Sequence, residues 1–457
     1  MTRIRTRAQE PLMRPSVTRT GSSRLDAQAV YSVSYDGLVN NNSFQKDGLF
    51  TYQGYQYAGW YTATGAAVIG RRSPGGSSWA TVTLAHRLKA EDSHNVISMG
   101  LSGVVGRLHI TMDSHSDAFF CVKSVAGLLD DPGSAPWTPA LLGAVQTSLD
   151  GVEPASRSTY PQFVSTPEGR LQLSCRTGIS GNGRNALAEH DGSRWSVLGE
   201  RTASDGTYTS EHGSSRARNM YLHGLDYDVH GRLHAFFTWR EQSGAVTKDS
   251  GGITNYDTCY VCSTDRGRTW RNDAGALVAT TGTADTVSVT DPGLVVDPLG
   301  PDHSLMNQES QWTDSAGLPH AIISYVPGRF GRCTTGYAGH RTANGRALNV
   351  RRNSAGTWEK TEIPVALNSS QRTKPVLDRY DNAYAVFPRG RIAGAPSAFG
   401  HTDWALLHDG GGLNAFGEVV IDEMRVGSEH VLSFMYQETS SGRTPSAPPV
   451  VDFALPA

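Results

Sequence analysis

Short stretches of alternating apolar and polar residues, separated by glycine-rich turns, recur along the whole chain. A period of two is typical of β-strands that bury one face, so the pattern predicts many short strands rather than a helical protein. In several copies a turn glycine comes directly before a short apolar strand; these copies lie at residues 106–110, 169–173, 231–235 and 317–321, with a diverged copy at 381–385. A second strand then leads to a turn with a tryptophan, as at Trp195, Trp270 and Trp358. Internal repetition of this kind predicts a fold assembled from similar small sheets.

The repeats also predict how the chain closes on itself. Six copies can be traced within residues 49–421, and the strand-like stretches 430–436 and 450–453 then lack a partner. The apolar stretch 29–33 could complete their sheet, and a ring closed in this way leaves no exposed sheet edge. We therefore predict an all-β, seven-bladed β-propeller over residues 28–457, a single domain whose ring is closed by the N- and C-terminal strands; six or eight blades are the alternatives.

The first 27 residues differ from the rest of the chain. They carry six arginines and few apolar residues, which is typical of a disordered extension, so we predict an Arg-rich tail at residues 1–27. The tail lacks the apolar core of a secretory signal, and no later apolar run is long enough to cross a membrane. We expect a protein that is either cytoplasmic or exported by a route that the sequence does not reveal.

The balance of charges narrows the classes of partner. Only 18% of the 457 residues are charged, and the formal net charge is −2. This composition does not favour polyanions in general, so an acidic ligand must meet a local basic pocket. We expect a monomer with no nucleic-acid and no membrane partner.

The cysteines do not predict a disulfide framework, because there are five of them in a long chain. Cys259 and Cys262 have the spacing of a metal-binding pair, but they lie in a strand-like stretch. Positions three apart in a strand point to opposite faces, so the pair cannot chelate as a zinc knuckle does.

One group of residues carries most of the candidate chemistry. His94, His115, Tyr160 and Arg176 lie at the edges of short strand-like repeats. Histidine titrates near neutrality, tyrosine can pass a proton to or from an oxygen, and arginine binds a carboxylate in a planar fork. Such a set suits the removal of a proton next to a carboxylate.

Other polar residues fit structural roles better. Residues 263–270 match the Asp-box hairpin, in which Asp265 caps the turn, Gly267 takes a positive φ and Trp270 packs between sheets. Asp265 is therefore not a site candidate. Each histidine of the repeated strands is also expected to be structural; these are His109, His234 and His320.

In combination, these motifs resemble the bacterial-neuraminidase-repeat propeller lyases, which include ulvan lyases and the rhamnosyl-glucuronate lyases that attack gum arabic. The resemblance covers about residues 28–440; its motifs are residues 221–228, 231–234, 237–241, the Asp-box, His94-Asn95, His115, 159–162, Arg176, Gly178, 180–181 and Asn307-Gln308. Residues 47–49 and 69–72 are most similar to the rhamnosyl-glucuronate branch. The resemblance implies a polysaccharide lyase that cleaves a rhamnose-α-1,4-glucuronate linkage by β-elimination and leaves a 4,5-unsaturated uronate. Its partner would be an acidic polysaccharide or oligosaccharide of glucuronate and rhamnose.

The roles needed for this elimination can be assigned to the candidate residues. His115 is the first candidate for the base, and His94 is a second base or a positioning group. Tyr160 would protonate the departing oxygen, or would act as the base if the substrate presents its other face. Arg176 and Arg240 would neutralise the carboxylate, although Arg240 could instead pair with Glu241 or a neighbouring blade.

Further residues are expected to bind substrate without taking part in proton transfer. Tyr221 follows the family pattern as another hydroxyl in the pocket, and His223 lies in the same stretch. Arg218 belongs to the polar segment 210–219, which looks like an inserted loop that contacts substrate.

Cofactors and other functions remain open to test. Catalysis by proton transfer and charge neutralisation requires no cofactor and no catalytic metal. Some members of the family hold a structural ion near the fourth blade, so calcium or zinc could bind there, but Tyr256 stands where a histidine is often found.

Two other functions are the alternatives to a lyase: a rhamnosidase- or sialidase-like hydrolase, and a non-catalytic glycan-binding propeller. The sequence does not distinguish exo from endo cleavage.

Overall fold

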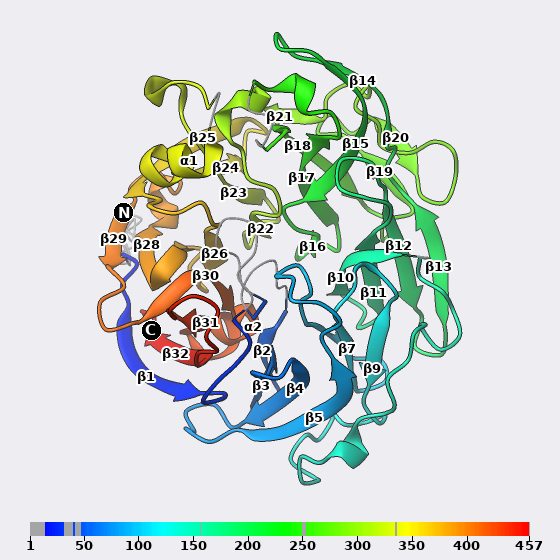
Figure 1. The fold of residues 1–457 in the computed structure, drawn as a ribbon, viewed down its shortest axis with the longest axis vertical. Helices are drawn as coiled ribbons and strands as arrows, with labels where there is room; N and C mark the ends of the chain where they lie inside the picture. Colours follow the sequence, from blue (N-terminus) through cyan, green and yellow to red (C-terminus); the bar gives the residue numbers. More distant parts are fainter. Residues whose placement is uncertain are drawn as a thin grey trace, which may run out of the picture.

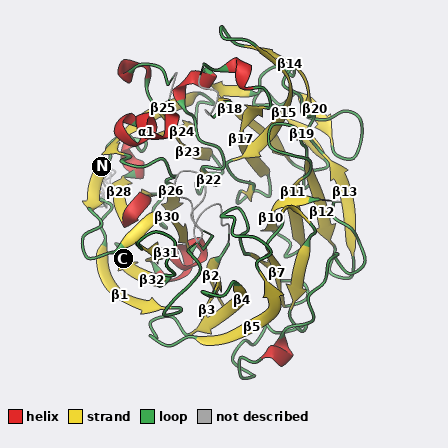
Figure 2. Cartoon of the chain, in the orientation of Figure 1, coloured by secondary structure: helices red, strands yellow, loops and turns green. Residues whose placement is uncertain are grey.

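The protein is described here from a computed structural model, which covers residues 14–31, 40–41, 47–155, 157–248, 253–333 and 336–456. Strands dominate the described chain, and they are arranged around a central axis (Figures 1 and 2). The prediction of an all-β, propeller-like protein is therefore confirmed. Among the described residues, no helix is long and apolar enough to cross a membrane.

The described strands form seven sheets. The first sheet contains β2 (Leu49–Tyr52), β3 (Tyr55–Tyr61), β4 (Ala66–Arg72) and β5 (Ala80–Arg87). The second contains β6 (Ser98–Ser102), β7 (Arg107–Met112) and β9 (Phe120–Lys123). The third contains β8 (His115–Asp117), β10 (Ser158–Ser165), β11 (Leu171–Arg176), β12 (Asn185–His190) and β13 (Trp195–Glu200).

The fourth sheet is the largest and contains β14 (Asp205–Thr209), β15 (Ser214–Leu222), β16 (Asp226–Tyr227), β17 (Leu233–Glu241), β18 (Asn255–Ser263), β19 (Thr269–Arg271), β20 (Leu277–Thr280) and β21 (Val295–Asp297). The fifth contains β22 (Ser310–Thr313), β23 (Pro319–Tyr325), β24 (Arg346–Arg352) and β25 (Trp358–Ala366). The sixth contains β26 (Lys374–Leu377), β27 (Ala383–Phe387), β28 (Arg391–Ala395) and β29 (Ala405–His408). The seventh contains β30 (Ala415–Ile421), β31 (Val431–Glu438), β32 (Pro449–Ala454) and β1 (Thr18–Arg24). The described residues also form two α-helices, α1 (Tyr337–Asn344) and α2 (Glu423–Glu429).

The apolar core lies between successive sheets rather than within one central layer. A cluster between the third and fourth sheets, for example, joins Leu187 to Leu233 and Trp270. Another cluster contains Trp60 from the first sheet and Met435 from the seventh, so the two ends of the series also pack together. Burial of these alternating side chains holds each small sheet against its neighbours.

The N-terminal segment corrects two predictions. Strand β1 pairs antiparallel with β32, with Arg24 opposite Pro449. The prediction of a disordered tail is therefore wrong for residues 18–24. The stretch that was expected to close the last sheet makes only an isolated bridge, from Ala29 to Ser446 and Thr62, and residues 32–33 lie outside the described part. Strand β1 lacks apolar alternation because, as an outermost strand, it exposes nearly every residue to solvent.

The Asp-box forms the predicted hairpin between β18 and β19. Asp265 Oδ1 accepts hydrogen bonds from the backbone amides of Arg268 and Thr269, at 3.1 and 2.8 Å. Gly267 has a φ of 78°, and Trp270 is buried against the neighbouring sheet. Asp265 therefore stabilises a turn, as its sequence context predicts.

Candidate active site

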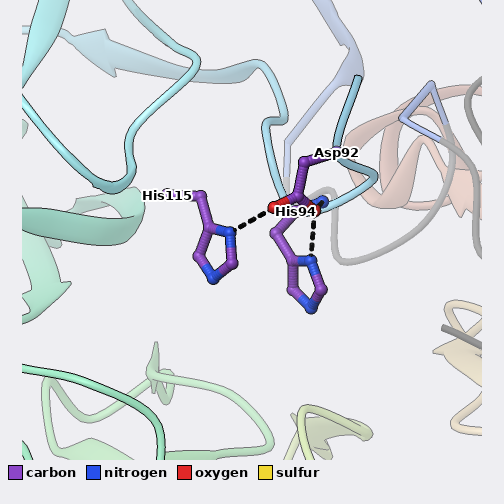
Figure 3. A group of neighbouring side chains, drawn as sticks. All are labelled: Asp92, His94 and His115. Carbon is purple, nitrogen blue, oxygen red and sulfur yellow. Dashed lines mark hydrogen bonds and ion pairs between the residues drawn. The ribbon is translucent and has the colours of Figure 1, made fainter. Parts of the chain in front are cut away.

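Asp92 and the two candidate histidines form one hydrogen-bonded group (Figure 3). His94 Nδ1 lies 2.5 Å from Asp92 Oδ1, and His115 Nδ1 lies 2.6 Å from Asp92 Oδ2. The two imidazole rings stack with their centroids 4.3 Å apart. One carboxylate thus binds Nδ1 of both rings and orients them. Nε2 is the nitrogen of each ring that Asp92 does not bind.

The backbone around His115 is held in an uncommon conformation. Asp113, Ser114 and Ser116 all have positive φ, between 53° and 71°, which non-glycine residues adopt rarely. The segment is tied down on both sides: His86 Nε2 lies 3.0 Å from Asp113 Oδ2, and the Ser116 amide donates to Thr159 Oγ1 at 2.8 Å. Strain that is maintained by such contacts is typical of functional loops.

Tyr160 is brought to the same place by an irregularity in strand β10. Its φ is 53°, and the pairing register between β10 and β11 shifts between Thr159 and Gln162. A bulge of this kind redirects a side chain relative to a regular strand. The Tyr160 ring centroid lies 5.9 Å from that of His94 and 6.2 Å from that of His115. The structure therefore brings together three of the predicted catalytic residues.

Arg176 ends strand β11 and is buried beside the two tyrosines. Its Nη1 donates to Tyr221 Oη at 2.7 Å, and its Nη2 donates to Thr159 Oγ1 at 3.1 Å. Its guanidinium also lies over the ring of Tyr160, 5.4 Å from the centroid. In the part of the chain that the structure describes, Arg176 forms no ion pair with a carboxylate, although a buried guanidinium favours an anionic partner.

Arg240 approaches Tyr221 from strand β17. Its guanidinium carbon lies 5.8 Å from the centre of the Tyr221 ring, and its side chain is only partly buried. Pairing of Arg240 with Glu241 does not occur, because Glu241 binds Arg218 instead. The site therefore combines two guanidinium groups on one tyrosine.

Arg218 and His223 do not belong to the substrate-accessible surface, so their predicted substrate contacts are corrected. Arg218 is fully buried, and its Nε lies 2.6 Å from Glu241 Oε1. The segment around it forms the β14–β15 hairpin rather than an inserted loop. His223 is also fully buried, and its Nδ1 accepts a hydrogen bond from the amide of Glu309 at 3.1 Å.

The surroundings of His94 and Asp92 shift the pKa values of both groups downward. Burial lowers the pKa of His94 to about 4, assisted by the charges of His115 and Arg372, although Asp92 acts in the opposite direction. Burial tends to raise the pKa of Asp92, but hydrogen bonds from the two histidines hold this pKa far below its usual value. Near neutral pH, His94 is thus neutral and Asp92 is ionised.

The pKa values of Tyr160 and Tyr221 are shifted in opposite directions. Burial raises the pKa of Tyr160, and the neighbouring Tyr221 raises it further. For Tyr221 burial acts upward, but the charges of Arg176 and Arg240 outweigh it and lower the pKa. Tyr160 therefore stays protonated at neutral pH and has a proton to donate, whereas Tyr221 is the stronger acid of the two.

Two groups of side chains among the described residues have the composition of metal ligands. The ligand atoms of Asp92, His94 and His115 lie within 4.8 Å of one another, but both carboxylate oxygens and both Nδ1 atoms already bind each other. The second group contains Glu211, His212 and Asp302. There Arg332 forms ion pairs with both carboxylates, so a guanidinium already balances the negative charge that a metal ion would neutralise.

Sequence reasoning missed Asp92 and Arg372. The only local signal for Asp92 is its position two residues before His94, whose amide donates to Asp92 Oδ1 at 3.0 Å. Arg372 comes from the loop before the sixth sheet; its Nε donates to Asn307 O at 2.7 Å and its Nη1 donates to Glu418 Oε1 at 3.1 Å. No local pattern marks Arg372 as a neighbour of His94.

The small sheets arranged around a central axis, together with the His–Tyr–Arg site, place the protein in the class of all-β propeller-type proteins. The model of the BNR repeat-containing family matches residues 55–366, so the chain belongs to this family, and the resemblance to the family is confirmed. The similarity to the rhamnosyl-glucuronate branch stays a prediction.

Comparison with individual proteins agrees with this assignment. The long isoform of ulvan lyase from Alteromonas sp. (strain LOR) is 24% identical over 254 residues, 46% of this chain; the chain spans only 25% of that protein's length. The crystal structure of the polysaccharide lyase Uly1 is similar over 95% of this chain and 99% of its own, with a TM-score of 0.71 and 15% identity. The structure of an ulvan lyase of family PL25 is similar over 92% of this chain and 95% of its own, with a TM-score of 0.63 and 13% identity. These similarities establish the shared fold.

Proposed function

We propose that the protein is a polysaccharide lyase that acts on a polymer of glucuronate and rhamnose. The observation that carries the proposal is the meeting of an Asp-bound histidine pair, a tyrosine and two arginines within one site. The similar proteins support it, because one solved PL25 ulvan lyase is bound to -[GlcA(1-4)Rha3S]-. Gum arabic side chains and ulvan are the substrates that we propose to test.

The site has the groups that a β-elimination needs. His115 Nε2 accepts the proton from C5 of the uronate, and the electrons of that C–H bond form the C4=C5 double bond. The C4–O4 bond breaks, and Tyr160 donates its proton to the departing oxygen. Exchange with solvent then returns a proton to Tyr160 and removes one from His115.

The remaining residues support these two proton transfers. Asp92 accepts a hydrogen bond from the Nδ1–H of His115, so Nε2 is the basic nitrogen of this ring. Arg240 contacts the substrate carboxylate. Arg176 and the Tyr221 hydroxyl stabilise the negative charge that develops on this carboxylate during proton removal. His94 stays neutral beside His115 and positions the sugar.

The alternative of a glycoside hydrolase is less well supported. Such an enzyme usually needs two carboxylates, one of which must be able to give up a proton. Asp92 is the carboxylate among these side chains, and both its oxygens accept hydrogen bonds from histidines.

We also propose that the fold is a seven-bladed propeller with a closed ring. Two observations support this: the described strands form seven sheets, and the seventh contains β1 beside β32. The cluster that joins Trp60 to Met435 packs the seventh sheet against the first.

The decisive experiment is an assay for the unsaturated uronate. Purified protein is incubated with ulvan or with gum arabic, and absorbance in the ultraviolet is followed together with released sugar. A lyase produces the chromophore, a hydrolase releases sugar without it, and a binding protein does neither. The matched control is the same polymer with its carboxyl groups reduced to alcohols, which removes both the charge that arginine binds and the acidity of C5. Equal turnover of that control would refute the mechanism.

A further inference from the structure

A small chamber adjoins the candidate active site and is bordered by several sheets. Its volume is about 50 Å³. Tyr160, Arg176 and Tyr221 of the site line it, together with Ser98 of β6 and Gln308, which precedes β22. The chamber is far too small for a sugar ring, so it is not the substrate site itself.

Three of the lining side chains have a buried polar atom without a hydrogen-bond partner among the described residues. The atoms are Nε of Arg176, Oγ of Ser98 and Oε1 of Gln308, and each exposes less than 1 Å² to solvent. The first is a donor, the second donates or accepts, and the third is an acceptor. Leaving such atoms unpaired is unfavourable, most of all for a charged guanidinium.

The backbone of Gln308 supports a built site rather than an accidental gap. Its φ is 51°, in the left-handed region that residues with a side chain rarely adopt. The preceding residue is fixed, because Asn307 accepts two hydrogen bonds from Arg372, at 2.7 and 3.1 Å. A strained position that is held in this way is characteristic of sites with a specific task.

We propose that the chamber is a binding site for water and that this water fixes the orientation of Arg176. A buried water needs only roughly 10–15 Å³ of such volume and binds two to four polar partners, which matches the three atoms. Arg176 is already held through Nη1 and Nη2, so a contact at Nε completes the positioning of its planar group. Ser98 and Gln308 are then positioning residues for the arginine. The catalytic consequence rests on the proposed function; the water site does not.

The site is tested by a high-resolution crystal structure and by two variants. We expect electron density for water within hydrogen-bond distance of Arg176 Nε and Gln308 Oε1. Ser98→Val fills the chamber, and Gln308→Met removes the amide while keeping its length. Each should lower kcat by about 10- to 100-fold, because a small misplacement of a charge-stabilising group is costly, and should change KM little. The matched control is Ser102→Val, because Ser102 is equally buried on strand β6 and does not line the chamber.

Several outcomes would overturn the inference. A chamber without water density in the wild-type crystal would refute the water site, whatever the activity. Near-normal kcat in Ser98→Val with an unchanged Tm would refute the positioning role. Equal losses in Ser98→Val and Ser102→Val would also refute it, since they would reflect a general effect on the strand. If the wild-type protein has no lyase activity, the proposed function fails, yet the crystal structure still decides the water site.

Discussion

Asp92 and His115 are joined by a 2.6 Å hydrogen bond between Oδ2 and Nδ1, across a separation of 23 residues. The carboxylate selects the tautomer of His115 and stabilises the imidazolium that forms when His115 accepts a proton. We therefore expect Asp92→Asn to lower kcat by roughly two to three orders of magnitude in a protein that remains folded. The control is Asp117→Asn, because Asp117 pairs with Lys89 at the surface. Equal activity of the two variants would remove Asp92 from the mechanism.

His115 and Tyr160 should act as a unit. Each of His115→Ala and Tyr160→Phe is expected to lower kcat by roughly two to four orders of magnitude, because each removes one proton transfer. The double variant should be scarcely worse than the poorer single variant. Formation of unsaturated product and thermal unfolding are measured together for all three. If folded Tyr160→Phe turns over normally, Tyr160 is not the acid; if His115→Ala does, the base is His94.

Two neighbouring arginines should respond in opposite ways to the same substitution. Arg240→Met should lower turnover while leaving Tm nearly unchanged, since Arg240 is partly exposed and has no carboxylate partner among the described residues. Arg218→Met leaves Glu241 buried without its ion pair, so we expect a loss of about 3–5 kcal/mol in the free energy of unfolding. Chemical denaturation and product formation separate the two effects. A large loss of stability in Arg240→Met would show that it is structural.

Stability should decrease as the pH falls from about 6.5 to 4. Burial lowers the pKa of His94 to about 4 and, together with the charge of His190, that of His109 to about 3. In this window the unfolded chain protonates these imidazoles while the folded protein keeps them neutral, so acid favours unfolding. Each histidine removes on the order of 3 kcal/mol by pH 4. Denaturation at several pH values should give a shallower dependence for His109→Gln, and an identical slope would contradict the assignment.

Turnover should not depend on a divalent ion. The proposed elimination needs only proton transfer and charge neutralisation. In the second group of possible metal ligands, Arg332 already forms ion pairs with Glu211 and Asp302. Treatment with chelator should therefore leave the rate of product formation unchanged. Loss of activity in chelator that is restored by calcium or zinc would contradict this.

Much of the site could be recognised from residue type and local context. His115 lies in a polar segment after a strand, and Arg176 ends an alternating strand whose apolar residues face inward, so both positions stand out in the sequence. Arg218 and His223 have the same chemical character, yet both are fully buried. Arg218 pairs with the carboxylate of Glu241, and His223 accepts a hydrogen bond from the backbone amide of Glu309. Neither partner can be inferred from the residues next to Arg218 or His223 in the sequence.

The sequence by itself determined the all-β class, the repeated strands, the Asp-box hairpin and most of the residues that meet in the site. These features depend on local alternation and turn chemistry, which act over a few residues. Only the tertiary structure decided that Asp92 joins His94 to His115, that strand β1 completes the last sheet, and that Ser98 and Gln308 border Arg176. Those contacts arise from the packing of distant loops and strands around the central axis, and the position of one segment relative to another is not encoded in the periodicity of either.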